Sequence, residues 1–126
     1  FDLGLCGPDR TDLANKAALC GAFKVPTLRN VATRQVFFHN GVFDNLADAL
    51  RFYVRRDTHP GQWYPRNNQG KVQKFNDLPA RYRANVNTKE APYDRQRGMA
   101  PALTEGEIED MVKFLATLTD GYQVQQ

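Results

Sequence analysis

The most regular pattern of apolar and polar positions lies near the end of the chain. Thr104 is followed three residues later by Glu107, which is the spacing of a capping box at the start of a helix. Five apolar residues then recur at helical intervals, and Gly121 follows as a stop signal. The five are Ile108, Met111, Val112, Leu115 and Leu118. This pattern predicts an amphipathic helix whose apolar side packs into the core.

A second helical pattern occupies the middle of the chain. Asp44 or Asn45 is a suitable N-cap, and basic side chains gather at the far end, where they suit the helix dipole. The apolar positions fall at i, i+3, i+4 and i+7 and share one face: Leu46, Ala49, Leu50 and Tyr53. Tyr53 is therefore expected to point inward, with its hydroxyl in need of a hydrogen-bond partner.

The remaining pattern is less regular. Thr11 to Leu19 are predicted to form a short helix that ends at Gly21. From Asp57 to Met99 the chain turns polar and contains four prolines, which predicts a long loop of the kind that is usually functional or packed over something. The predicted elements are helices, so the expected fold is all-α, with a long irregular loop over residues 54–100.

Composition and charge reduce the number of function classes that the chain can belong to. The 126 residues carry 17 Lys and Arg against 14 Asp and Glu, a net charge of +3, and the cations accompany no recognised nucleic-acid motif. We therefore expect no nucleic-acid partner. No apolar run approaches the roughly 20 residues that cross a bilayer, so we also expect no membrane span. The length of the chain is that of a single domain.

The two cysteines limit the chemistry that the chain performs by itself. Cys6 precedes Gly-Pro and Cys20 precedes Gly-Ala, so neither belongs to the C-x-x-C-H unit that attaches a c-type haem. The pattern favours a disulfide over two buried free thiols. Closing this short loop would stabilise the fold by about 3 kcal/mol in the chain-entropy treatment. A disulfide implies an oxidising compartment.

The central segment carries a specific resemblance. Residues 23–32 read FKVPTLRNVA, residues 37–41 read FFHNG, and the predicted helix with its Leu46, Ala49 and Leu50 follows. This run resembles the second haem domain of the bacterial di-haem cytochrome c peroxidases, a family that includes the MauG-type enzymes. At the position of Tyr53 the peroxidases usually carry a methionine that binds the second haem iron, whereas MauG-like members carry a tyrosine. The resemblance thus implies a cytochrome c-like haem domain with Tyr53 as axial ligand, where a phenolate stabilises ferric iron.

The same resemblance implies roles for other residues. Lys24, Arg29 and His39 would shape the propionate side of the haem, although lysine lacks the bidentate fork of the arginine found at position 24 in many members. Calcium is a further candidate ligand, bound through backbone carbonyls in the segment before His39. The loop resembles an insertion in some MauG-like proteins, and its aromatic residues are candidates for a redox relay or, more simply, for pinning the loop: Trp63, Tyr64 and Tyr93.

The resemblance covers only the later part of one haem domain. Residues 1–126 are therefore expected to be its C-terminal portion, with haem c attached on an absent N-terminal portion or on a partner chain. The implied parent is a periplasmic di-haem oxidoreductase that uses hydrogen peroxide and takes electrons from a donor protein, a protein substrate or a small donor. Two alternatives stay open. One is a monohaem electron-transfer cytochrome with Met99 as axial ligand, and the other is a haem-free structural fragment.

Overall fold

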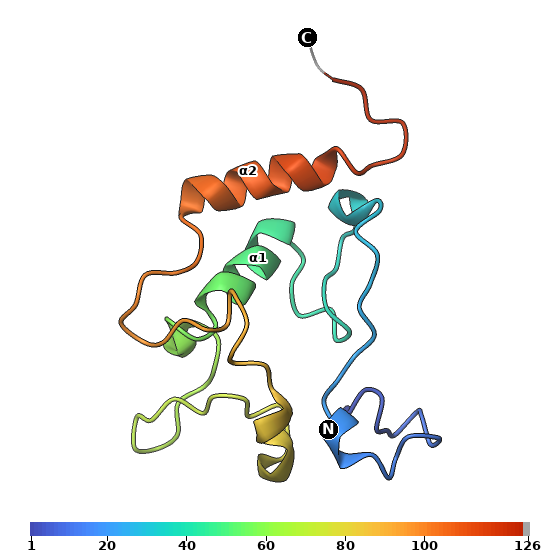
Figure 1. Cartoon of the computed structure of the whole chain (residues 1–126). Coiled ribbons are helices and arrows are strands. Elements are labelled where there is room, and N and C mark those ends of the chain that lie inside the picture. The colour runs from blue at the N-terminus through green and yellow to red at the C-terminus, as the bar shows by residue number, and fades with distance from the viewer. Residues whose placement is uncertain (125–126) are drawn as a thin grey trace.

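The computed structural model describes residues 1–124, which form two α-helices and four short 3-10 helices (Figure 1). The α-helices are α1 (Leu46–Arg55) and α2 (Glu105–Ala116). The 3-10 helices are η1 (Ala17–Leu19), η2 (Val31–Thr33), η3 (Pro60–Gln62) and η4 (Ala80–Asn85). Extended pairing over residues 1–124 is limited to three isolated bridges, so the helical class predicted from the sequence is confirmed. None of the helices in this part of the chain has the length and apolar character of a membrane span.

Both α-helices begin where their caps predict. Thr104 accepts a hydrogen bond from the Glu107 amide at 3.3 Å, and the Glu107 carboxylate accepts one from the Thr104 amide at 2.7 Å, which completes the capping box of α2. At α1 the Asn45 side chain accepts from the amides of Ala47 and Asp48. Asn45, rather than Asp44, is therefore the N-cap.

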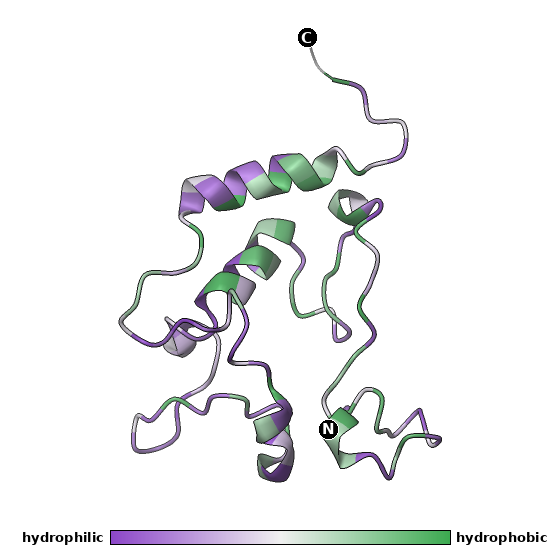
Figure 2. Ribbon diagram, viewed as in Figure 1, coloured by the Kyte–Doolittle hydropathy of each residue, from purple (hydrophilic) through white to green (hydrophobic). Residues whose placement is uncertain are grey.

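The core lies where α2 crosses α1. Its buried members are Val31, Phe37, Ala49 and Leu115, and half-buried apolar side chains pack around them, among them Leu46, Leu50, Met111 and Leu118. Figure 2 shows the apolar residues of the two helices gathered at their junction, whereas the loop after α1 is largely hydrophilic. The apolar stripe of the last helix is thus the core-facing stripe that its spacing predicted.

Ion pairs add a polar seam between the two helices. Arg51 binds Asp48 on its own helix at 2.7 Å and Glu105 at the start of α2 at 2.9 Å. Arg55 also reaches the Glu105 carboxylate. Because an acidic residue in the first turn of α2 receives cations from α1, the seam fixes how the helices cross.

The N-terminal segment differs from its prediction. The helix expected over Thr11–Leu19 is wrong: turns occupy the first part, and only η1 is helical. Asp12 binds Arg10 at 2.6 Å instead of capping a helix, and the segment's few apolar residues bury too little surface to hold a short helix. The segment is instead closed by a disulfide between Cys6 and Cys20, with Cα atoms 4.7 Å apart.

The loop after α1 is ordered around one buried ionic group. Asp57, whose side chain is 5% exposed, accepts from Arg56 at 2.7 and 2.8 Å and pairs with Lys74. The Arg56 guanidinium lies over the rings of Phe75 and Tyr93, at 5.2 and 4.1 Å from their centroids. We call these five residues the Arg56 anchor. It ties both halves of the loop to the end of α1.

Candidate functional site

Tyr53 lies on the last turns of α1, beyond the level at which α2 crosses. The inward orientation expected for it is wrong: the residue is 39% exposed, while its neighbour Val54 is 4% exposed. Its hydroxyl has no hydrogen-bond partner within residues 1–124. The ring meets Phe38 edge-on at 5.3 Å and Tyr93 at 6.1 Å between centroids. Tyr53 is thus a partly covered phenol whose oxygen is free to bind a group outside this chain.

An unusual backbone conformation sets one wall of this site. Phe38 has a φ of +66°, in the left-handed region that a bulky side chain rarely adopts. The same residue meets the rings of Phe43 and Phe52 at 5.3 and 5.4 Å as well as that of Tyr53. The strained turn of the FFHNG motif therefore delivers an aromatic ring against the candidate ligand.

The surroundings of Tyr53 are apolar enough to affect its ionisation. Burial raises the pKa of the Tyr53 phenol, and burial is the dominant cause that raises the pKa of Tyr93 to about 12. Both phenols are therefore neutral at pH 7 in this chain. A cation at the exposed side of Tyr53 would favour its phenolate, because an opposite charge at close range stabilises the charged form.

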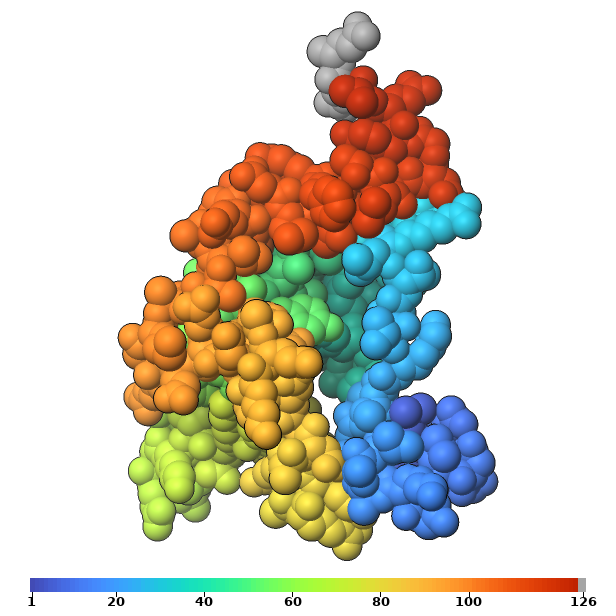
Figure 3. All heavy atoms as spheres, viewed as in Figure 1, coloured from blue at the N-terminus to red at the C-terminus, as the bar shows by residue number. Residues whose placement is uncertain are grey.

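The surface beside α1 is hollowed. In Figure 3 the hollow lies between the segment of residues 20–35 and the segment of residues 80–90, with α1 at its inner end. Asn85 joins the two chain segments by donating to the carbonyls of Ala17 and Cys20, at 2.8 and 3.0 Å. Gly21 allows Leu78 to pack close to the backbone here, since a Cβ at position 21 would lie 2.9 Å from the Leu78 side chain.

The three basic or imidazole residues predicted for the site lie along the segment before α1. Arg29 forms a bidentate ion pair with Asp120, at 2.9 and 3.0 Å, beyond the end of α2. His39 stacks on Phe23 with centroids 3.8 Å apart and lies 3.8 Å from the Asp2 carboxylate. Lys24 is exposed and has no carboxylate partner within residues 1–124. Arg29 and His39 thus have partners within the chain, whereas the Lys24 ammonium group is free to bind an anion.

Met99, the rival ligand, is engaged locally. It is 46% exposed, and its sulfur accepts a hydrogen bond from the Gln96 amide at 3.2 Å in the turn before it. No group of three or more His, Cys, Asp and Glu side chains is placed to hold a metal ion anywhere in residues 1–124. Tyr53 differs from Met99 in that its donor atom is uncommitted.

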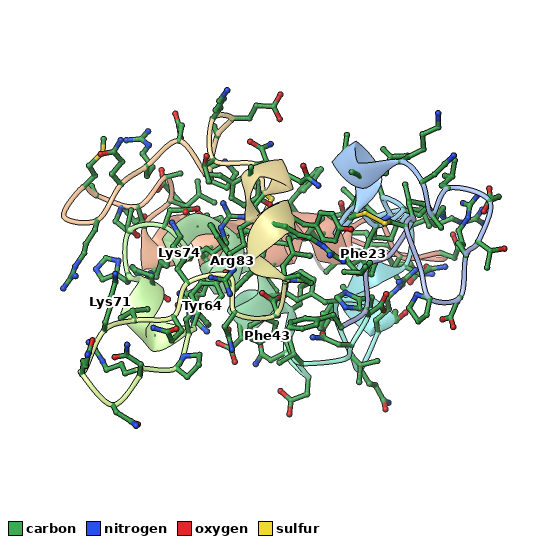
Figure 4. The ribbon with its side chains drawn as sticks, turned by 90° about the horizontal axis from the view of Figure 1, so that it is seen from below. Phe23, Phe43, Tyr64, Lys71, Lys74 and Arg83 are labelled. Carbon is green, nitrogen blue, oxygen red and sulfur yellow. A yellow bond between two sulfur atoms is a disulfide. The ribbon has the colours of Figure 1, made fainter. Side chains whose placement is uncertain are left out.

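The aromatic residues of the loop connect to Tyr53. Phe52 meets Trp63 at 5.5 Å and Tyr64 at 6.5 Å between centroids, and Tyr53 meets Tyr93. In Figure 4, Tyr64 and Phe43 lie toward the middle of the molecule, while Phe23 lies apart from them near the disulfide. Sequence reasoning singled out the loop aromatics but missed Phe38 and the Arg56 anchor, which no local periodicity signals.

The donor set fits a haem iron. An axial ligand must present an uncommitted donor atom in apolar surroundings, and Tyr53 does so, with the aromatic rings of Phe38 and Tyr93 beside it. The covalent attachment must come from elsewhere, because neither cysteine is in a C-x-x-C-H unit.

Comparison with known proteins agrees with this geometry. The chain is 34% identical over 106 residues to the methylamine utilization protein MauG of Paracoccus denitrificans (strain Pd 1222). Among solved structures it is similar to the di-haem peroxidase BthA of Burkholderia thailandensis E264, with a TM-score of 0.81 and 42% identity. A tyrosine-to-methionine variant of that peroxidase gives a TM-score of 0.82. The predicted resemblance to MauG-like di-haem peroxidases is confirmed. No protein-family model matches the chain.

The similarity covers most of this chain but a small part of each relative. It spans 82% of the chain and 24% of MauG, and 96% of the chain and 28% of each BthA structure. The chain therefore spans about a quarter of the length of each of these relatives.

Proposed function

We propose that this chain is the part of a MauG-like di-haem oxidoreductase that closes over the second haem, and that Tyr53 is the axial ligand of its iron. The observation that carries the proposal is the exposed, uncommitted phenol of Tyr53 among the rings of Phe38, Phe52 and Tyr93. The haem c, attached through a C-x-x-C-H unit outside this chain, supplies the redox chemistry when it is bound. The complete protein would use hydrogen peroxide and take electrons from a protein or small donor.

The chain's own residues would hold and shield the iron ligand. Phe38, Phe52 and Tyr93 surround the phenol and limit its contact with water, and the rigid α1 fixes the direction of its oxygen. A phenolate is a hard anionic donor, so it favours ferric and higher oxidation states, whereas a methionine thioether raises the potential.

The propionate side would be shaped by the segment before α1. Lys24 is an exposed cation there that lacks a carboxylate partner within residues 1–124, so it is free to bind a propionate. Arg29 would act through its pair with Asp120, which ties this segment to the end of α2. Any calcium would be bound by backbone carbonyls in the segment before His39, because residues 1–124 offer no cluster of metal-binding side chains.

The disulfide supports a periplasmic location for the protein. The bond between Cys6 and Cys20 persists in an oxidising environment, which favours the periplasm. A c-type di-haem protein there would exchange electrons with another protein or a small donor.

The test replaces Tyr53 by Phe and, separately, by Met in the full-length haem-loaded protein. We expect both changes to alter the ferric optical and electron paramagnetic resonance spectra of one haem, and the methionine to add a sulfur-to-iron charge-transfer band. Tyr122→Phe is the matched control, since Tyr122 is exposed at 48% and lies beyond α2. Spectra unchanged in Tyr53→Phe but altered in Met99→Leu would replace the proposal by the Met99 alternative, and a protein without haem would leave only a structural role.

A further inference from the structure

The positive charge of the chain is concentrated in one segment. Residues 57–99 contain eight Lys and Arg against four Asp and Glu, a net charge of +4, and the remaining residues contain nine against ten, a net charge of −1. The net positive charge of the chain therefore lies in the loop that the Arg56 anchor holds in place, because cations outnumber carboxylates only there. Figure 4 shows Lys71 and Lys74 on the loop, on the side away from Phe23.

Of the eight cations in this segment, only Lys74 and Arg95 form ion pairs within residues 1–124, and Arg66 and Arg97 are among the six that do not. Asp57 is committed to Arg56 and Lys74, and Asp94 lies 3.7 Å from Arg95. Arg66 and Arg97 form no ion pair within residues 1–124, and both are exposed. Arg66 is nevertheless held in position, because it donates to the Gly70 carbonyl at 2.9 Å.

These cations line two adjoining clefts. The first cleft is lined by Arg66 and Arg97, and the second by Lys74, Arg95 and Arg97 together with Asp57, whose carboxylate is already paired with Arg56 and Lys74. Each cleft has a volume of about 310 Å³. Arg97 and Pro60 belong to both clefts, so they form the boundary between them. Each cleft alone is at the lower end of the range for small-ligand pockets. A ligand that spans both clefts would meet four cations.

The second cleft also leads to the candidate iron ligand. Tyr93 lines that cleft, and its ring meets the ring of Tyr53 at 6.1 Å between centroids. One aromatic side chain therefore separates a molecule in the cleft from Tyr53. The Arg56 anchor contributes Asp57, Lys74 and Tyr93 to the wall of this second cleft, so that wall is ordered before a ligand binds.

We infer that this pair of clefts is the docking surface for an acidic protein partner, whose carboxylates bind Arg66 and Arg97 across the boundary at Pro60. Arginine presents a planar fork that binds carboxylates through two parallel hydrogen bonds. A nucleic acid fits less well, because single strands need exposed aromatic rings for stacking and the rings of Trp63, Tyr64 and Tyr93 are packed against other side chains. A role of this surface in electron transfer rests on the proposed function, in which the partner is the electron donor or protein substrate.

The experiment measures binding of poly-L-glutamate to the full-length haem-loaded protein by calorimetry at 20 and 200 mM NaCl. We expect binding at low salt that weakens at high salt, as electrostatic association does. The double variant Arg66→Glu, Arg97→Glu should bind at least about tenfold more weakly, because it turns two attractions into repulsions. The control Lys16→Glu, Arg34→Glu makes the same change in net charge at exposed cations outside the loop, and it should change affinity less than about twofold.

Several outcomes would overturn the inference. Equal weakening in both double variants would show an effect of net charge alone. Tighter binding of a single-stranded oligonucleotide through the same two arginines would assign the clefts to nucleic acid, and displacement of poly-L-glutamate by equimolar succinate would assign them to a small dicarboxylate. The haem spectrum separates this test from that of the proposed function: Arg66→Glu, Arg97→Glu should leave it unchanged, whereas Tyr53→Phe should alter it and leave poly-L-glutamate binding intact.

Discussion

Removing the charge of Asp57 should loosen the whole loop while leaving the helices in place. Asp57→Asn keeps the size of the side chain but takes away the carboxylate that binds Arg56 and Lys74. Arg56 would then be a buried cation, 9% exposed at its side chain, without its counter-charge. Breaking a buried ion pair from one side costs about 3 to 5 kcal/mol because the remaining charge stays buried.

Two features of the structure place the expected cost at the lower end of that range. Lys74 is 33% exposed at its side chain, so it can turn toward water when its partner is lost. Arg56 keeps the Asn87 carbonyl at 2.5 Å and the faces of the Phe75 and Tyr93 rings. We therefore expect about 3 kcal/mol, which corresponds to a factor of roughly 100 to 200 in the opening equilibrium of the loop.

Hydrogen exchange followed by mass spectrometry on the full-length protein measures this opening directly, since local unfolding exposes amides without global unfolding. The amides of Tyr82, Val86 and Tyr93, which donate to carbonyls within the loop, should exchange faster by about that factor. Asp94→Asn is the control, because the contact of Asp94 with Arg95 is long and exposed and is worth less than about 1 kcal/mol. An acceleration below tenfold in Asp57→Asn, or an equal one in α2, would refute the reasoning.

Two further predictions concern the ends of the chain. Thr104→Ala removes the side-chain half of the capping box and should lower the free energy of unfolding by about 1 kcal/mol. It should also speed exchange in the first turn of α2, and an unchanged first turn would contradict the cap. Replacing Cys6 and Cys20 together by serine should cost about 3 kcal/mol through the entropy of the opened loop. Dithiothreitol should lower the free energy of unfolding of the unmodified protein by a similar amount, seen as a lower melting temperature, and should have no effect on the double variant. A lower melting temperature in both proteins would argue against this loop as the cause.

The parts of the fold that the sequence predicts are those with local signals. The capping box and the apolar stripe of α2 are contained within one helical segment, and so is the cap at Asn45. The exposure of the Tyr53 side chain, by contrast, has no local signal in the sequence. Periodicity determines which residues share a face with Leu46 and Leu50, but it does not determine what covers that face. Because α2 crosses nearer the start of α1, it buries Leu46 and Leu50 in part and leaves Tyr53 exposed.

The Arg56 anchor could not be predicted for a related reason. Arg56 and Asp57 are neighbours in sequence, but Lys74, Phe75 and Tyr93 reach them from distant turns that have no periodic pattern. A polar loop rich in proline gives the same composition whether it is mobile or anchored. Only the placement of one buried carboxylate between two cations shows that this loop is anchored.

The anchor also connects the two proposals in physical terms. Tyr93 stacks with Arg56, lines the second cleft and meets the ring of Tyr53, so a single side chain belongs to the scaffold, the docking surface and the surroundings of the candidate ligand. A loop that opened freely would move Tyr93 away from Tyr53 and admit water to the phenol. The buried charge of Asp57 therefore has a consequence beyond stability: by holding the loop closed, it keeps both the cationic clefts and the aromatic cover of Tyr53 in one arrangement. Loosening the loop by Asp57→Asn should accordingly alter the haem spectrum, whereas Arg66→Glu, Arg97→Glu should leave the haem spectrum unchanged and affect poly-L-glutamate binding alone.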